Sequence, residues 1–228
     1  MPRPTDAVLA AAVGRMFHAP GRAAVSERHL LHAAPGRGVE RLLVAGRPVV
    51  VKWRDDRPED REALLYYGLQ PAVLRLLCAP RPMGALCLEG THLLFLEWLE
   101  GRDADWTAAA DVRRAFTHLG LVHRASAARL RRGPAALAGP SAWREIQPEA
   151  AEASGPLVLD PGDLHAANFR LRPEGSVSML DFENMRLRAP QTALRPLRED
   201  ESTPRGSLAV LARSAYAAAW PDAPFPTA

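Results

Sequence analysis

A short segment in the C-terminal half, residues 168–181, restricts the fold of this chain more than any other. It begins at Asn168 with Asn-Phe-Arg-Leu-Arg, turns at Pro-Glu-Gly (173–175), continues as Ser-Val-Ser-Met-Leu (176–180) and ends at Asp181. Two short runs on either side of a glycine-containing turn predict an antiparallel hairpin. Because such a hairpin brings its outer ends together, we expect Asn168 and Asp181 to lie side by side.

These two end residues carry the oxygen ligands that Mg²⁺ prefers. An amide oxygen and a carboxylate form a partial coordination shell, which Mg²⁺ completes with waters and phosphate oxygens. Asp163 lies in the segment just before Asn168, where a further carboxylate is able to orient and deprotonate a hydroxyl nucleophile. Each of these residues taken singly is also explained by turn capping or by a strand end. The three together are much harder to explain in that way.

The segment Gly-Asp-Leu-His-Ala-Ala-Asn-Phe, followed by Leu-Asp-Phe-Glu, resembles the catalytic segment of aminoglycoside phosphotransferase-like kinases, which are relatives of the protein kinases. The family pattern is H-G-D-x-H-x-x-N followed by a hairpin and an acidic triplet, and its matches here are Gly162, Asp163, His165, Asn168 and Asp181. The leading histidine of the pattern is replaced by Pro161, which bears on loop geometry rather than on chemistry. His165 fits either a loop-bracing or a catalytic residue.

The resemblance implies an α+β, bilobal protein-kinase-like fold, with a small β-rich N-lobe and a mainly helical, shortened C-lobe. It places the N-terminal lobe at residues 1–96, a hinge at 97–101 and the C-terminal lobe, with the catalytic loop and metal site, at 102–228. Only 47 residues follow Asp181 (228 minus 181), and that part of the chain shows no clear equivalent of the family's acceptor pocket.

Local sequence patterns predict elements in the same order. We expect strands within 27–53, with turns at 34–38 and Gly46-Arg47, and helices from Pro58 to about Gly68 and from Pro71. A buried strand is expected within 91–101, a mostly irregular segment over 134–154, and helices near the N-terminus (7–13) and over about 207–220. A helix within 104–130 is indicated by apolar residues on one face: Val112, Phe116, Leu119 and Val122.

Lys52 is the only lysine among 29 Lys and Arg residues, and it ends the apolar run Val-Val-Val-Lys. In the kinases that the chain resembles, a lysine on the third strand contacts the α- and β-phosphates of ATP and pairs with a helical glutamate. Glu62 is the expected partner here, with Glu59 as the alternative. An ammonium is a compact charge and a guanidinium is a broad planar fork, so a narrow phosphate site distinguishes them.

The resemblance also assigns residues to the rest of the nucleotide site. The segment Phe-Leu-Glu-Trp-Leu-Glu-Gly (95–101) resembles the hinge of these kinases, where the Glu97 carbonyl and the Leu99 amide would hold adenine. Gly36 and Gly38 stand where the family has its phosphate loop, but they lack the full glycine pattern, and a plain hairpin turn explains them equally well.

The function that the resemblance implies is an ATP- and Mg²⁺-dependent phosphotransferase that moves the γ-phosphate to a hydroxyl of a small molecule, with Asp163 as the catalytic base. Two alternatives with the same fold are a nucleotide-binding pseudokinase, favoured by Pro161, and a regulatory interaction protein. The sequence does not identify the acceptor. Aminoglycosides are polycations, so a protein that binds them needs an acidic pocket. The C-terminal part has one acidic cluster, residues 199–201, and Asp222 stands alone, so we do not expect an aminoglycoside acceptor.

Composition excludes other classes of function. The formal net charge is +3, and the arginines are scattered rather than clustered, which argues against a nucleic-acid partner. The longest apolar stretches fall far short of the about 20 residues that span a membrane. Cys78 and Cys87 match no metal-binding spacing, so we expect two buried thiols and a cytoplasmic protein. The oligomeric state is not specified by the sequence.

Overall fold

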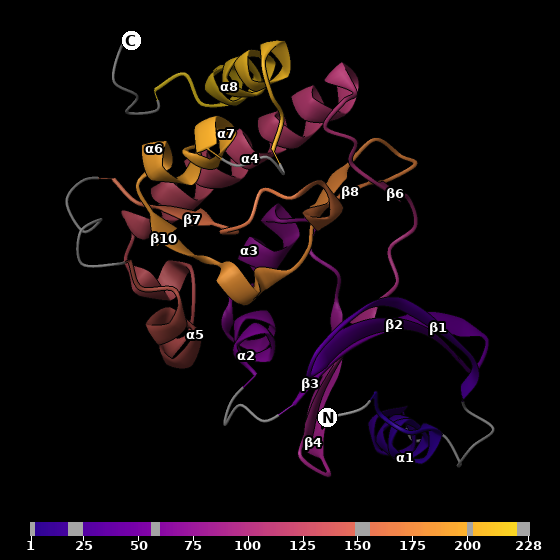
Figure 1. Ribbon diagram of the computed structural model, residues 1–228. Coiled ribbons are helices and arrows are strands. Elements are labelled where there is room, and N and C mark those ends of the chain that lie inside the picture. The colour runs from indigo at the N-terminus through magenta and orange to yellow at the C-terminus, as the bar shows by residue number, and fades with distance from the viewer. Residues whose placement is uncertain (1–2, 18–24, 56–59, 149–155, 200–202, 223–228) are drawn as a thin grey trace. The chain divides into compact units, whose positions relative to one another are not determined.

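The fold is described from a computed structural model of the chain for residues 3–17, 25–55, 60–148, 156–199 and 203–222 (Figure 1). The chain divides into two compact units. The first comprises Met1–Ala63 and Pro80–Leu99, and the second comprises Leu64–Ala79 and Glu100–Ala228. The predicted lobe boundaries stay a prediction, although the last change of unit along the chain, between Leu99 and Glu100, falls inside the predicted hinge.

The first unit is built on a five-stranded antiparallel sheet with the order β1-β2-β3-β5-β4. Its elements are α1 (Asp6–Phe17), β1 (Val25–Ala34), β2 (Arg37–Val44), β3 (Arg47–Asp55), β4 (Pro82–Leu88) and β5 (Thr91–Glu97). Helix α2 (Arg61–Gly68) then runs across the boundary into the second unit.

Two tight turns set the register of this sheet. Ala45 and Gly46 join β2 to β3 with φ angles of 48° and 76°, and Glu89 and Gly90 join β4 to β5 with φ angles of 51° and 76°. Positive φ at both central residues is the backbone geometry that matches the twist of a two-residue hairpin. The β2–β3 turn is therefore centred one residue earlier than predicted from the sequence.

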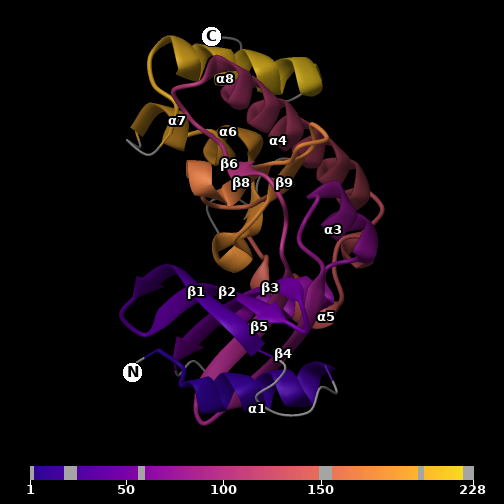
Figure 2. The same cartoon turned by 90° about the vertical axis from the view of Figure 1, so that its right-hand side faces the viewer.

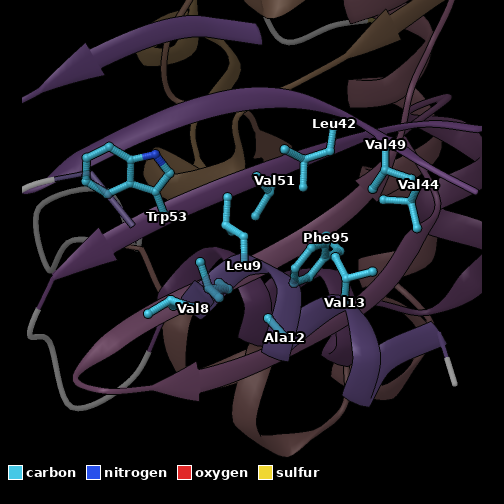
Figure 3. Packing of buried hydrophobic residues seen from close by; sticks show 11 residues of the cluster. Val8, Leu9, Ala12, Val13, Leu42, Val44, Val49, Val51, Trp53 and Phe95 are labelled. Atoms are coloured by element: carbon cyan, nitrogen blue, oxygen red, sulfur yellow. The ribbon is translucent and has the colours of Figure 1, made fainter. Parts of the chain in front are cut away.

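The hydrophobic core of the first unit lies between α1 and one face of the sheet (Figure 3). In β3 the buried residues alternate, as Val49, Val51 and Trp53, so Lys52 points to the opposite face. The core residues from the helix are Val8, Leu9, Ala12 and Val13, and those from β2 and β5 include Leu42, Val44, Leu93 and Phe95. The apolar stripe of α1 thus covers the α1-facing side of the sheet.

A buried carboxylate also lies on the α1-facing side. Glu40 of β2 is fully buried, and both of its oxygens accept hydrogen bonds from Arg3 and Arg28, at 2.7–2.9 Å. Arg28 also pairs with Asp6 and donates to the carbonyl of Pro4 at 3.0 Å. This network ties the start of the chain and β1 to β2.

The second unit is mainly helical, with two small sheets. Its helices are α3 (Pro71–Leu76), α4 (Ala109–Leu130), α5 (Pro140–Glu145), α6 (Pro190–Ala193), α7 (Pro196–Glu199) and α8 (Ser207–Ala219), with short 3-10 turns η2 (Pro134–Ala136), η4 (Ala166–Asn168) and η5 (Phe182–Asn184). Its strands are β6 (Arg102–Asp103), β7 (Val158–Asp160), β8 (Phe169–Leu171), β9 (Val177–Met179) and β10 (Arg186–Arg188).

Helices α4 and α8 lie against each other along this unit (Figure 2). Gly120 permits their close approach, because a Cβ there would lie 2.8 Å from both the Ala219 Cβ and the Tyr216 carbonyl oxygen. The predicted apolar face of α4 is confirmed, since the four residues that define it are fully buried: Val112, Phe116, Leu119 and Val122.

The observed elements confirm the predicted fold class, an α+β fold with a β-rich first part and a mainly helical second part. The predicted C-terminal helix corresponds to α8, and the helix predicted from Pro71 to α3. Two differences stand out. Strand β4 was not predicted, and the segment 134–154, expected to be irregular, contains α5, which has a proline in its first turn where no hydrogen-bond donor is needed.

Candidate active site

Lys52 and Glu62 form an ion pair in the first unit. The ammonium of Lys52 lies 2.8 Å from Oε1 and 2.7 Å from Oε2 of Glu62, so it bridges both carboxylate oxygens. The Glu62 side chain is 3% exposed and that of Lys52 is 22% exposed. A carboxylate this deeply buried requires a paired charge. The pairing predicted from the sequence is therefore present in the structure.

Glu62 is placed by the start of α2. Asp60 precedes the helix, and its Oδ1 accepts from the backbone N–H groups of Glu62 and Ala63 at 3.0 and 3.3 Å. These are donors that a helix leaves unsatisfied in its first turn, so Asp60 acts as the N-cap. Glu62 consequently sits in the first turn of the helix. Glu59, the alternative partner, lies outside the described residues.

The loop that carries Asp163 begins where β7 ends, at Asp160, and its course depends on Gly162. This glycine has φ +85°, and a Cβ on it would lie 2.1 Å from the carbonyl oxygen of Asn184. Both the positive φ and the close backbone approach require glycine. The loop before Asp163 thus packs directly on η5, which begins immediately after Asp181.

Asp163 itself is held by the backbone that follows it. Its Oδ1 accepts a hydrogen bond from the His165 N–H at 3.0 Å. The Nδ1 of His165 accepts from the Ala167 N–H at 3.3 Å and caps η4. These contacts support the loop-bracing interpretation of His165.

The predicted hairpin is present, and its outer ends lie together. Strands β8 and β9 pair in antiparallel register from Phe169 opposite Met179 to Leu171 opposite Val177. Beyond the last pair, the Leu180 N–H donates to the Asn168 carbonyl at 2.9 Å. The register therefore pairs Asn168 with Leu180, one position before the predicted neighbour Asp181.

Asp181 has a left-handed backbone conformation, with φ 59° and ψ 81°. This region is sparsely populated for residues other than glycine, and strained backbone of this kind is concentrated at functional sites. Asp181, which lies between β9 and η5, is therefore held in this conformation by its surroundings. Ala45 and Glu89 adopt the same backbone region in hairpin turns, and at Asp181 it forms the bend from β9 into η5.

The donor set at this end of the hairpin fits Mg²⁺. Asn168 and Asp181 offer an amide oxygen and a carboxylate, and the Asn168 amide nitrogen lies 3.5 Å from the Asp163 carbonyl oxygen. Mg²⁺ takes oxygen ligands and keeps several waters or phosphate oxygens, so two protein side chains are sufficient. Among the described residues there is no cluster of three or more His, Cys, Asp or Glu side chains that could hold a metal without such help.

The two glycines of the predicted phosphate loop have clear structural roles. Gly36 has φ +71° in the turn between β1 and β2. Gly38 lies opposite Trp53 in the β2–β3 pair, and a Cβ on it would come within 2.6 Å of the Trp53 ring. A hairpin turn and a packing position account for both residues, and their proposed contact with phosphate stays a prediction.

The residues predicted to hold adenine lie at and after the end of β5. The Glu97 N–H donates to the Arg81 carbonyl at 3.0 Å, and its side-chain Oε2 accepts from the Arg81 N–H at 3.2 Å. Leu99, two residues further on, is buried. The adenine contacts of Glu97 and Leu99 stay a prediction.

A buried polar network includes Asp160, the residue where β7 ends and the Asp163 loop begins. The sequence did not predict this network. Asp160, 1% exposed, has its Oδ2 3.2 Å from Arg188 Nη1 and its Oδ1 3.7 Å from His123 Nε2. The other ring nitrogen of His123 lies 2.7 Å from the Tyr216 hydroxyl. Burial, and then the charge of Asp160, raise the pKa of Tyr216 far above its usual value. The only signal in the sequence was a histidine next to the apolar stripe of α4.

Among the described helices, none combines the length and apolarity needed to cross a bilayer.

The two cysteines differ from the sequence-based expectation. Both are free thiols, but Cys87 is exposed and Cys78 is only partly buried, so the prediction of two buried thiols was wrong. Burial raises the pKa of the Cys78 thiol.

Comparison with known proteins identifies the fold. No family model and no curated protein sequence matches the chain. Among solved structures, an aminoglycoside-3'-phosphotransferase of type VIII is 20% identical, with a TM-score of 0.57 over 96% of this chain and 94% of that one. A macrolide 2'-phosphotransferase from Brachybacterium faecium is 17% identical, with a TM-score of 0.57 over 93% of this chain and 82% of that one.

A further match is a thermostable mutant of the aminoglycoside phosphotransferase APH(4)-Ia in ternary complex with ADP and hygromycin B. It is 10% identical, with a TM-score of 0.60 over 94% of this chain and 83% of that one. Identities this low establish similarity of fold, and the alignments extend over nearly the whole chain. The chain therefore has the protein-kinase-like fold of the aminoglycoside and macrolide phosphotransferases.

Proposed function

We propose that this protein is an ATP- and Mg²⁺-dependent phosphotransferase that transfers the γ-phosphate to a hydroxyl group of a small molecule. The observation that carries the proposal is the Lys52–Glu62 pair, in which the only lysine of the chain bridges a buried carboxylate. Structural neighbours with this fold include an enzyme in complex with ADP and hygromycin B, which supports a nucleotide donor and a small-molecule acceptor.

The proposed roles follow from the chemistry of each side chain. Lys52, oriented by Glu62, provides a compact positive charge for the α- and β-phosphates, and Glu97 and Leu99 offer backbone groups to adenine. Asn168 and Asp181 would hold Mg²⁺, which when bound supplies positive charge that neutralises the phosphate oxygens. A role for Gly36 and Gly38 beside the phosphates belongs to the same proposal.

Asp163 is the proposed catalytic base. The acceptor oxygen bonds to the γ-phosphorus while the bond from that phosphorus to the β–γ bridging oxygen breaks, and ADP leaves. The acceptor proton passes to a carboxylate oxygen of Asp163. The hydrogen bond from the His165 N–H holds Oδ1, which fixes the side-chain direction in advance of the reaction.

The proposal is tested by nucleotide binding followed by an acceptor screen. ATP with Mg²⁺ should raise the thermal midpoint, because a ligand at 100 times its Kd adds about 2.7 kcal/mol to the stability of the folded state. EDTA should remove most of the shift. Release of ADP is then measured across hydroxylated metabolites, macrolides and aminoglycosides.

Each result of this test has a distinct meaning. A metal-dependent shift together with acceptor-dependent ADP release supports the phosphotransferase. A shift without transfer to any acceptor would favour a nucleotide-binding pseudokinase instead. If millimolar ATP produces no shift at any Mg²⁺ concentration, both the phosphotransferase and the nucleotide-binding pseudokinase are wrong. A regulatory interaction protein is then the better description.

A further inference from the structure

Trp106 contacts the Asp163 loop directly. Its indole Nε1–H donates to the Leu164 carbonyl at 3.1 Å, and the two residues are 58 positions apart in the sequence. Trp106 is 9% exposed and Leu164 is 3% exposed. A buried carbonyl needs a hydrogen-bond partner, and here the partner is a side chain from the segment before α4.

The peptide unit that Trp106 holds is the one that contacts the proposed catalytic base. The carbonyl of Leu164 and the N–H of His165 belong to the same planar peptide group, and in a trans peptide they point in opposite directions. The carbonyl accepts from Trp106, and the N–H donates to Asp163 Oδ1 at 3.0 Å. Fixing the carbonyl therefore also fixes the direction of the N–H that orients Asp163.

The indole ring is itself held in one orientation by aromatic neighbours. Its centroid lies 5.7 Å from that of Phe116 in α4 and 5.4 Å from that of Phe169, the first residue of β8. These separations lie within the range of favourable aromatic contacts. Phe169 directly follows Asn168, so the same ring also packs beside the hairpin end that carries the proposed metal ligands.

We propose that Trp106 is a positioning residue for Asp163, which acts through the Leu164–His165 peptide. No motif in the sequence contains Trp106, and the proposed function assigns it no role. The consequence for turnover rests on the proposed function, whereas the restraint on the peptide does not. Without the indole donor, the peptide loses the partner that holds its carbonyl inward, and the Asp163 carboxylate loses a fixed orientation.

The test compares Trp106→Phe, which keeps an aromatic ring but removes the donor, with Trp220→Phe. Trp220 is a matched control, because it is 7% exposed and packs beside Tyr216 at the end of α8 in the same unit. Amide hydrogen exchange of residues 162–168 is measured without nucleotide. We expect faster exchange at the His165 amide in Trp106→Phe and no change there in Trp220→Phe. Unchanged exchange in Trp106→Phe overturns the proposal.

Turnover supplies the second readout. Misplacement of a reacting group costs up to about 100-fold, so we expect kcat to fall about 10–100-fold in Trp106→Phe, with KM for ATP unchanged. In an Asp163→Asn background the same substitution should cost little, because residues that act as a unit are not additive. A loss of equal size in both backgrounds shows that Trp106 does not act through Asp163 and overturns the proposal.

The two proposals fail separately. If the parent protein transfers no phosphate but Trp106→Phe still accelerates exchange at His165, the phosphotransferase is wrong and the restraint by Trp106 is supported. If Trp106→Phe does not fold, benzothienylalanine at position 106 replaces it. That residue keeps the bicyclic shape and has sulfur in place of the N–H, so the same changes in exchange and kcat are expected, and their absence overturns the proposal.

Discussion

The ammonium of Lys52 lies within 2.8 Å of both carboxylate oxygens of Glu62, in a chain where every other Lys or Arg position is arginine. A guanidinium binds a carboxylate through a planar fork, whereas an ammonium approaches both oxygens as one small charge. The structure therefore places the only lysine of the chain in an ion pair with a buried carboxylate.

Lys52→Arg should impair ATP use although it preserves the charge. We expect turnover to fall at least about tenfold, because the larger fork cannot reproduce the point contact, while the thermal midpoint without nucleotide changes little. The matched control is Arg47→Lys, an exchange in the opposite direction at the exposed start of the same strand, which should leave turnover unchanged. If Lys52→Arg turns over ATP like the parent, the lone lysine is an accident of composition.

Asp163→Asn and Asp181→Asn should give different phenotypes. Asp181 is proposed to hold Mg²⁺, so its loss should weaken both metal-dependent nucleotide binding and transfer. Asp163 is proposed to take the acceptor proton, so Asp163→Asn should bind ATP and Mg²⁺ normally but slow transfer by about 10²–10⁴-fold. Calorimetric titration and ADP release measure the two effects. Equal loss of nucleotide affinity in both variants would mean that Asp163 is a structural or metal residue.

Gly162→Ala should disrupt the Asp163 loop. The substitution places a methyl group 2.1 Å from the Asn184 carbonyl at a φ of +85°, and backbone strain of this kind alone costs about 1–3 kcal/mol. The matched control is Gly133→Ala, because Gly133 has φ +103° but a Cβ there meets no described atom within 4 Å. Urea unfolding should show a larger loss for Gly162→Ala. Equal losses would mean that the clash is relieved by movement of η5.

Acid should destabilise the first unit through Glu40. Burial by itself raises the pKa of Glu40, but its hydrogen bonds with Arg3 and Arg28 outweigh this and hold the pKa below its ordinary value of 4.5. The unfolded chain therefore binds this proton at a higher pH than the native protein does. The stabilisation is complete above about pH 4.5 and is lost as the pH falls through the lower native pKa.

Glu40→Gln tests this dependence. The free energy of unfolding at pH 7 should fall by about 1.5–3 kcal/mol, the usual contribution of hydrogen bonds to a charged group. As the pH falls from about 5 to about 3, the loss of stability measured by urea unfolding should be less steep in the variant, because it has no carboxylate to protonate at this position. Glu27→Gln, at an exposed position of β1, is the control. An unaltered slope in Glu40→Gln would assign the acid sensitivity to other carboxylates.

The sequence alone determined the features that depend on local pattern. The apolar stripe of α4, the hairpin that brings Asn168 beside the neighbour of Asp181, and the helix α8 follow from periodicity and turn residues, which act over a few positions. The pairing of Lys52 with Glu62 was predicted through the family resemblance. Lys52 lies near the end of β3, and Glu62, ten residues later, lies in the first turn of α2, which Asp60 caps.

Only the tertiary structure decided which distant groups complete the site. The contact of Trp106 with Leu164 joins positions 58 residues apart, and Gly162 is required by a backbone oxygen of Asn184. Neither residue type predicts its partner, because a tryptophan fits many cores and a glycine fits many turns. Such contacts are selected by chain packing, which satisfies buried carbonyls and carboxylates with whatever donors the fold brings near them.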